Sequence, residues 1–269
     1  MSIMSKSNEL VEKEKFYINH FGNLCCYEDY LMTVDLMGIK HNDPRLLSML
    51  PKCSGHKFVI AGGEIIWVGD NGEKVDNPNI DAIQSFTFYH NRELHRVDIP
   101  STIRFIGNWA FGCCENINSL KITDAITNIG DYAFAGCINL TEVKLPSKLI
   151  EIGSEAFEGC TSLVSVTIPG SVGVIPNRCF SDNPMLENVE IGNGVHTIKY
   201  HAFCNCKKLT EIILPRSIDI LDITAFQECD NLKRIKIPAS CRLVNNNTAA
   251  TMDSSILSAY MPKCEVIRY

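Results

Sequence analysis

Apolar residues return every 23 positions through most of this chain. The most regular column is aromatic and consists of Phe111, Phe134, Phe157, Phe180, Phe203 and Phe226. A fixed period of this length is typical of a solenoid, because each repeat can bury its apolar side only against its neighbours. Ile83 and Phe88 lie one period before Ile106 and Phe111, so a degenerate repeat is expected to begin near residue 75.

Within each repeat, the apolar columns have two different spacings. Val143 and Leu145 show the period of two that is typical of a short strand with one face inward, and Pro146 ends that strand. Further along, the residues from Ala156 to Cys160 have the i, i+3 and i+4 spacing of a tight helical turn. Every repeat is therefore predicted to run strand, turn, helical turn and loop.

The whole unit reads L-x-x-V/I-x-I/L-P-x-x-I-x-x-I-G-x-x-A-F-x-x-C-x-x-L, for instance from Leu140 to Leu163. Over about residues 80–244 this unit resembles the BspA-like leucine-rich repeats. The Asn or Cys that usually follows L-x-x-L-x-L is absent, with Thr102 and Ser171 among the residues there, so the commonest repeat type fits less well. The resemblance implies a curved, parallel-stranded solenoid that binds proteins or mediates adhesion, often at a cell surface.

The expected architecture is an α/β repeat solenoid. It is a leucine-rich-repeat-like, right-handed coil with a parallel β-sheet on one face, short helical turns on the other, and a cap at each end. Residues 80–244 form the repeats, and residues 245–269 are interpreted as the C-terminal cap. That cap is expected to contain a short helix after Asp253 and a last strand from Glu265 to Tyr269.

Residues 1–79 do not follow the repeat and are interpreted as the N-terminal cap. Helices are expected at 7–21, 27–37 and 44–50. Two strands at 58–60 and 65–68 are then expected to form a hairpin around Gly62-Gly63. A small separate domain with its own partner stays an alternative for this region.

Composition and charge limit the kinds of partner. Hydrophobic residues make up 45% of the chain and charged residues 21%, which predicts an ordered globular protein. The net charge of −6 argues against nucleic acid and anionic membranes, which favour basic patches. No run of 18 apolar residues is present, so no insertion into a membrane is expected.

The chain has 13 cysteines, an odd number, and five of them belong to one column of the repeat, namely Cys114, Cys137, Cys160, Cys206 and Cys229. Disulfides between neighbouring positions of a column would repeat a strained geometry along the stack. We therefore expect reduced thiols that pack in the core as small hydrophobes. Reduced cysteines favour a reducing compartment.

The location of the protein is left open by two opposing indications. The first residues, MSIMSKSNELVEKEKF, are charged where a signal peptide needs an apolar core, which predicts a cytoplasmic protein. The family resemblance instead implies a cell-surface or secreted protein. Unconventional export, a signal removed from this chain, or a truly intracellular protein would each reconcile the two.

The sequence contains no recognisable catalytic motif. A nucleophile elbow, a P-loop, a dinucleotide fingerprint and H-E-x-x-H are all absent. Cys53-x-x-His56, with Cys25 and His41 upstream, has zinc-ligand residue types at irregular spacing, and ordinary packing is the simpler interpretation. We therefore predict no catalytic residue, no metal and no cofactor; an enzyme would need a site within residues 1–79.

The candidate binding surface is the outward side of the strands, where consecutive repeats present a rigid array. The candidate residues on it are Arg96, Asp98, Lys121, Glu142, Lys144, Thr167, Glu190, Glu211 and Ile213. Their charges have mixed signs, so neither a polyanion nor a polycation is the expected ligand. Ile213 is an apolar exception and a candidate contact, and a merely solvated face stays an alternative.

These features predict a non-catalytic, monomeric repeat protein that binds a protein partner. The resemblance suggests adhesion or interaction with a host or cell surface as its biological form. The alternative is an intracellular scaffold or regulatory module for protein–protein interaction, which the missing export signal and the reduced cysteines favour.

Overall fold

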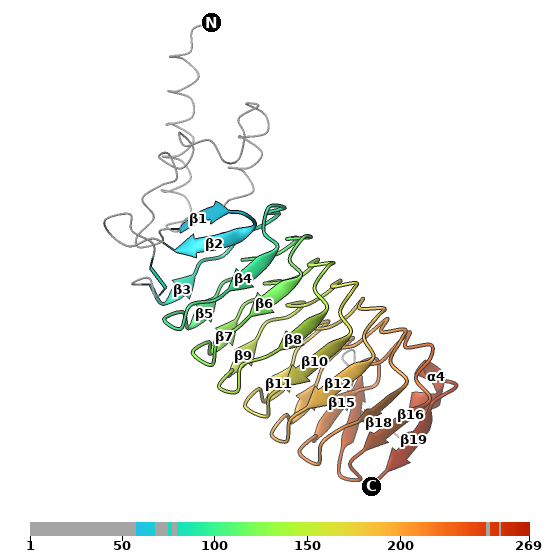
Figure 1. Ribbon diagram of the computed structural model, residues 1–269. Helices are drawn as coiled ribbons and strands as arrows, with labels where there is room; N and C mark the ends of the chain where they lie inside the picture. Colours follow the sequence, from blue (N-terminus) through green and yellow to red (C-terminus); the bar gives the residue numbers. More distant parts are fainter. Residues whose placement is uncertain (1–57, 68–74, 77–79, 246–247, 253) are drawn as a thin grey trace, which may run out of the picture.

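The computed structural model describes residues 58–67, 75–76, 80–245, 248–252 and 254–269. Successive repeats stack into a coil of about seven turns, with the ends of the described chain far apart (Figure 1). The fold is a leucine-rich-repeat-like solenoid with parallel strands, as the period of 23 residues predicts. The helices expected between residues 7 and 50 lie outside the described residues, and the right-handedness of the coil stays a prediction.

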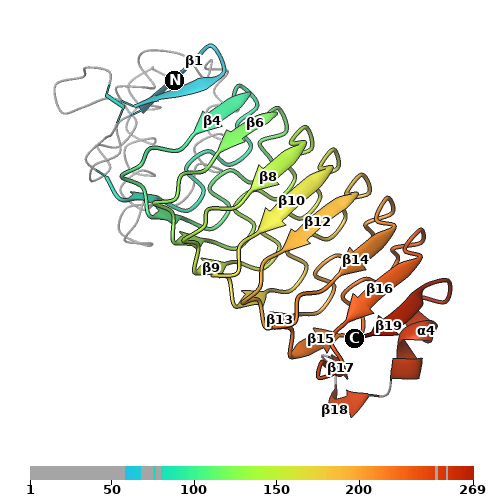
Figure 2. The same cartoon turned by 60° about the horizontal axis from the view of Figure 1, so that its bottom comes forward.

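The first strand of each repeat lies on one side of the coil (Figure 2), and we call this side the first sheet, although its hydrogen bonding is interrupted between β6 and β8 and between β12 and β14. Its strands are β2 (Glu64–Trp67), β4 (Arg96–Asp98), β6 (Ser119–Lys121), β8 (Glu142–Lys144), β10 (Ser165–Ile168), β12 (Asn188–Ile191), β14 (Glu211–Ile213), β16 (Arg234–Ile237) and β19 (Glu265–Arg268). Val143, Val166 and Val189 lie opposite one another in the parallel register, 23 residues apart. Such columns point inward, whereas the residues on either side face outward.

A second series of strands, the second sheet, lies on another side of the coil, with its hydrogen bonding interrupted between β9 and β11, and was missed by the sequence analysis. Its strands are β3 (Ala82–Ile83), β5 (Phe105–Ile106), β7 (Asn128–Ile129), β9 (Glu151–Ile152), β11 (Val174–Ile175), β13 (Thr197–Ile198), β15 (Ile220–Asp222), β17 (Arg242–Asn245) and β18 (Thr248–Met252). Most of these strands have two residues, which is too short to show the period of two. At this place in the repeat the sequence analysis predicted only a turn.

The predicted helical turns are wrong. The described repeats contain turns at these positions and no helix. From Trp109 to Cys114, successive N–H groups alternate between two kinds of acceptor. Phe111 donates to the carbonyl of Ala133 in the next repeat at 2.8 Å, whereas Gly112 donates three residues back within its own repeat at 3.0 Å. A helix needs every N–H to bond within its own turns, and here half of them bond the neighbouring repeat instead.

The backbone conformation also excludes a helix there. The residues two before and two after the core phenylalanine have positive φ in most repeats. The non-glycine members of these columns have φ between 52° and 61° and are Phe86, His90, Trp109, Cys113, Tyr132, Glu155, Arg178, Asp182, His201, Asn205 and Glu228. Gly136 and Gly159 occupy the second column with φ of 70° and 66°. Left-handed residues at this spacing interrupt any right-handed helical turn.

The phenylalanine column forms a continuous stack at the centre of the coil. Adjacent rings from Phe88 to Phe226 are 4.9 to 5.6 Å apart between centroids and within 16° of parallel. This spacing matches the distance between neighbouring strands and the range for offset aromatic pairs. All seven rings are at most 1% exposed, so the stack joins every repeat into one core.

Both ends of the described coil carry additional elements. At the N-terminal end, β1 (Phe58–Ala61) pairs antiparallel with β2 across Gly62 and Gly63, whose φ angles of 60° and 82° suit a two-residue hairpin turn. At the C-terminal end, η1 (Ser254–Ile256) and α4 (Leu257–Tyr260) precede β19, which pairs with β16. These elements lie where the sequence predicts them. Their role as caps stays a prediction.

Within the described residues, no helix has the length and apolar character to cross a membrane.

Candidate binding face

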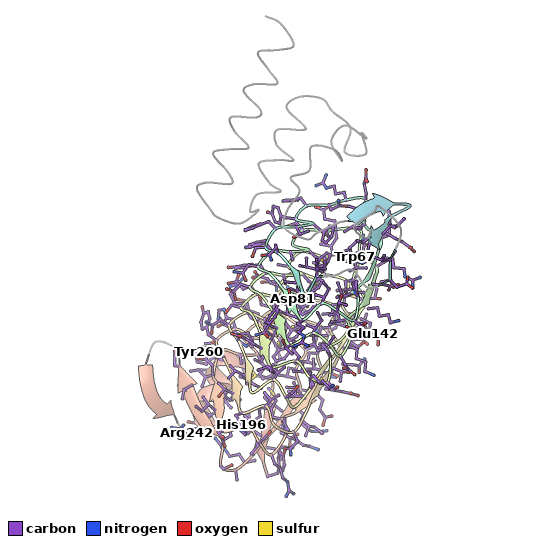
Figure 3. All side chains as sticks on the ribbon, turned by 90° about the vertical axis from the view of Figure 1, so that its left-hand side faces the viewer. Trp67, Asp81, Glu142, His196, Arg242 and Tyr260 are labelled. Atoms are coloured by element: carbon purple, nitrogen blue, oxygen red, sulfur yellow. The ribbon has the colours of Figure 1, made fainter. Side chains whose placement is uncertain are left out.

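The nine candidate residues lie on the outward side of the first sheet, between β4 and β14. This first-sheet face consists of two outward columns, one through Arg96, Glu142 and Glu211 and the other through Asp98, Lys144 and Ile213. Eight of the nine side chains are exposed, and Thr167 is half-buried. Figure 3 marks Glu142 on this side of the coil. The parallel register therefore brings these residues together on one surface.

The N-terminal end of this face is internally neutralised. The Arg96 guanidinium lies 2.8 Å from the carboxylate of Asp98, two residues away on the same strand. The hydrogen bond to Asp98 raises the pKa of Arg96 above its ordinary value. Both side chains are about half exposed, so solvent weakens the pair, and its main effect is to hold the two side chains together.

The C-terminal end is neutralised by a larger set of ion pairs. Arg234 lies 3.2 Å from Glu265 and 3.4 Å from Glu211, and Lys236 lies 3.9 Å from the same Glu211. The hydrogen bond to Glu265, with the charge of Glu211, raises the pKa of Arg234. Of the candidate residues, Glu211 therefore already has two basic partners within the protein.

The centre of the face differs from its ends. Lys121, Glu142 and Lys144 form no ion pair with any other described residue. Thr167 donates a hydrogen bond of 3.4 Å to Glu190, the residue opposite it in the register. Charges without an internal partner are the ones that an external partner can engage without first breaking an ion pair.

Ile213 is the one large apolar side chain on the candidate list, and it is 54% exposed. It lies opposite Lys236, and beyond that lysine the same column continues to Ile267 on β19. An exposed apolar side chain beside charged neighbours is a common contact at the centre of protein interfaces.

The outward side of the second sheet is a surface that the sequence analysis did not identify. It exposes Phe105 by 43%, Ile150 by 66% and Val174 by 40%, all on or next to its short strands. The signal for this surface was the residue before each inward isoleucine, which is apolar in several repeats. It was missed because no second strand was predicted.

The described residues offer little for catalysis or metal binding. They contain no group of three or more His, Cys, Asp or Glu side chains arranged to hold a metal ion. The repeat cysteines are free and buried, and burial raises the pKa of the Cys160 thiol to about 12, which suppresses its thiolate form. The Cys53 and His56 pair lies outside the described residues.

One cluster of charges lies on the turn side. Arg178 pairs with Glu158 and also lies 3.3 Å from Asp182 and 3.8 Å from Glu155. Burial, followed by a hydrogen bond with Glu158, raises the pKa of Glu155. The three carboxylates share a single guanidinium, so the cluster is satisfied internally and links neighbouring repeats.

Two parallel ladders around a stacked core define the class of protein, a leucine-rich-repeat-type β-solenoid. The family described as "BspA type Leucine rich repeat region" matches residues 70–187 and 174–267, with six copies of the repeat. This chain belongs to that family. Its members are generally non-catalytic modules for protein interaction or surface proteins.

Solved structures of bacterial leucine-rich repeat proteins are similar to this chain. One from T. pallidum is 24% identical, with a TM-score of 0.42, and the match covers 57% of this chain and 87% of that protein. One from Bacteroides ovatus is 15% identical, with a TM-score of 0.30 and coverages of 80% and 98%. A leucine-rich cell surface protein from Faecalibacterium prausnitzii is 19% identical, with a TM-score of 0.31 and coverages of 81% and 89%.

Because the identities and TM-scores are this low, we infer no function from these structures. No curated protein matches the chain.

Proposed function

We propose that this protein is a non-catalytic binding module that holds a protein partner on its first-sheet face. The main support for the proposal is that charged side chains at the centre of that face lack ion pairs. Lys121, Glu142 and Lys144 are exposed there and have no ion pair with another described residue, whereas the charges at both ends of the face are paired internally. Membership of a family that generally mediates protein interactions supports the same conclusion.

Rigidity is the physical basis of the proposed binding. Each outward side chain projects from a strand that pairs with at least one neighbouring strand, and an inward residue anchors the strand, such as Val143 between Glu142 and Lys144. Binding then orders only side chains and not the backbone. Backbone ordering therefore adds nothing to the entropic cost of association, and complementarity of shape and charge decides specificity.

The biological form of the binding is proposed to be adhesion or interaction with a cell or host surface. A second candidate is an intracellular scaffold or regulatory module. The observation that favours the second is the set of ten free cysteines among the described residues, since extracellular conditions oxidise thiols. Labelling of intact cells with a membrane-impermeant reagent separates the two, because only a surface protein is labelled.

The binding proposal is tested by capturing partners from the native source with matched baits. The bait Lys144→Ala/Glu190→Ala removes one charge of each sign from the first-sheet face. The control Lys208→Ala/Glu228→Ala makes the same change at exposed positions of the turn side. We expect a partner that the wild-type and control baits retain and the face bait loses. Equal retention by all three baits would contradict the proposal.

A further inference from the structure

The turn between β12 and β13 contains an asparagine followed by a glycine, Asn193-Gly194. Asn193 is exposed, and its side chain makes no hydrogen bond with another described residue. Figure 3 labels His196, which follows this turn, toward the C-terminal end of the coil. An asparagine that precedes glycine is chemically labile, because glycine has no side chain to shield its backbone nitrogen. Asn193 therefore has the local sequence of a residue that loses its side-chain amide.

The reaction that this sequence favours is an intramolecular loss of ammonia. The backbone nitrogen of Gly194 attacks the Cγ atom of Asn193, the new N–Cγ bond replaces the Cγ–Nδ2 bond, and the amide proton of Gly194 leaves with the ammonia. Water then opens the resulting five-membered succinimide at either of its carbonyls, which gives aspartate or isoaspartate. Water is the only other reactant, and no electrons are transferred.

Ser217 holds the nitrogen that would react. It lies one period after Gly194, and its hydroxyl accepts a hydrogen bond of 2.9 Å from the N–H of that glycine. The same hydroxyl donates to the carbonyl of Val195 at 2.7 Å. A hydroxyl can accept and donate at once, so the two bonds form together. Attack on Cγ requires the release of the Gly194 N–H, and this release forfeits the bond to Ser217.

The backbone of the turn also opposes the reaction. The N–H of Val195 donates to the carbonyl of Gly192 at 3.3 Å, which makes residues 192–195 a β-turn. Gly194 has φ of 123°, whereas Asn193 has a negative φ, which is the order of a type II turn. The residue before the glycine has an extended ψ in such a turn. Closure of the succinimide ring therefore requires rotation of the Asn193 backbone.

Neighbouring repeats leave the turn little room to rotate. Gly170 lies one period before Asn193, and a Cβ atom on Gly170 would be 2.0 Å from the carbonyl oxygen of Asn193. A Cβ atom on Gly194 would be 2.3 Å from the carbonyl oxygen of Gly170. On the other side of the turn, Asp219 donates to the carbonyl of His196 at 2.8 Å. The turn is thus fixed between the preceding repeat and the following one.

We propose that Asn193 is a modification site, which water converts to aspartate and isoaspartate, and that Ser217 sets the rate by holding the N–H of Gly194. Isoaspartate adds a carbon atom to the main chain at the place where Gly170 already lies in close contact with the turn. The modified turn no longer fits the stack and loosens the coil between β12 and β13. This inference is independent of the proposed binding function.

The test follows Asn193 by mass spectrometry of peptides from the full chain, after incubation in a neutral, reducing buffer. Ser217→Ala removes both hydrogen bonds of the hydroxyl. We expect Asn193 to react about three- to tenfold faster in this variant, the factor that corresponds to one net hydrogen bond. Ser217→Thr keeps the hydroxyl and is expected to react like the wild type, since Thr102 occupies the same column in another repeat.

Ser171→Ala is the matched control. Ser171 belongs to the same column as Ser217, but its hydroxyl donates to the carbonyl of Ser147 at 3.0 Å and not to the turn at Asn193. Removal of this hydroxyl is expected to leave the rate at Asn193 unchanged. The folded wild type is also compared with the wild-type chain unfolded in guanidinium chloride, which measures the protection without any substitution.

The proposal is supported if Asn193 reacts in the unfolded chain, reacts more slowly in the folded wild type, and reacts faster in folded Ser217→Ala than in the other folded proteins. It is overturned if Asn193 stays intact in the unfolded chain, or if it reacts equally in the folded and unfolded wild type. It is also overturned if folded Ser217→Ala reacts no faster than the wild type, or if Ser217→Thr or Ser171→Ala accelerates the reaction as much. The melting curve of each variant checks that the coil is folded.

Discussion

The thiol of Cys137 donates a hydrogen bond of 3.3 Å to the backbone carbonyl of Phe111 in the preceding repeat. The same bond joins Cys160 to Phe134 and Cys206 to Phe180, each at 3.3 Å. Where the column has asparagine, the side-chain amide replaces the thiol and donates to Phe157 at 3.0 Å. The column therefore requires a small, buried hydrogen-bond donor, and not only a small hydrophobe.

Asn183 provides a direct test of this requirement. Asn183→Ala removes two hydrogen bonds, to the carbonyls of Phe157 and Phe180, and leaves a small cavity. We expect the free energy of unfolding to fall by about 2–3 kcal/mol. Asn183→Cys is expected to stay within about 1 kcal/mol of the wild type, because a thiol makes the same bond in neighbouring repeats. Urea unfolding of the three proteins measures both differences, and equal losses in the two variants would show that the donor does not matter.

The buried thiols also predict a loss of stability at alkaline pH. Burial raises the pKa of Cys160 to about 12, and burial followed by the charges of Glu228 and Asp182 raises that of Cys204 to about 12. An unfolded thiol has a pKa of about 8.5. Between these values the unfolded chain has lost protons that the folded chain keeps. Stability is therefore complete below about pH 8.5 and falls above it, by up to about 1.4 kcal/mol per pH unit for each such thiol.

Urea unfolding between about pH 8 and pH 10, in a reducing buffer, measures this slope. Cys160→Ala is the matched variant, because it removes one titrating thiol from the core. Its stability is lower throughout, but its slope with pH is expected to be shallower than that of the wild type. An identical slope would mean that Cys160 does not contribute to the alkaline loss.

The repeat columns predicted the core well, for a physical reason. A side chain that is buried in every turn, such as Phe157, is constrained in the same way each time, so its column keeps one residue type. The turn side was predicted less well. The helical spacing of Ala156 and Cys160 is real, but their segment bonds to the next repeat, and this pairing has no signature in the spacing of apolar residues.

The candidate binding face could be predicted only in part. The position of Lys144 follows from the strand pattern, but its lack of an ion pair depends on side-chain positions that a single sequence does not determine. The outward side of the second sheet could not be predicted, because a strand of two residues such as Phe105–Ile106 has no periodicity.

The columns of residues with positive φ predict an unusual effect of glycine. Glu228 is exposed and has φ of 60°, at the position where other repeats have Gly136 and Gly159. Glu228→Gly is expected to stabilise the protein by about 0.5–1 kcal/mol, because it relieves a conformation that is costly for a residue with a Cβ atom. Gly159→Ala is expected to destabilise by a similar amount, although its Cβ would meet nothing within 4 Å. Thermal or urea unfolding checks both signs, and a destabilised Glu228→Gly would refute this explanation.

The most direct test of the proposed function is site-specific photo-crosslinking in the native source. A photoreactive side chain is placed at Lys144 on the first-sheet face, and in a separate protein at Asn128 on the outward side of the second sheet. We predict that the captured partner protein is crosslinked from Lys144 and not from Asn128. Crosslinking of that partner from Asn128 but not from Lys144 would contradict the central claim that the first-sheet face is the binding surface.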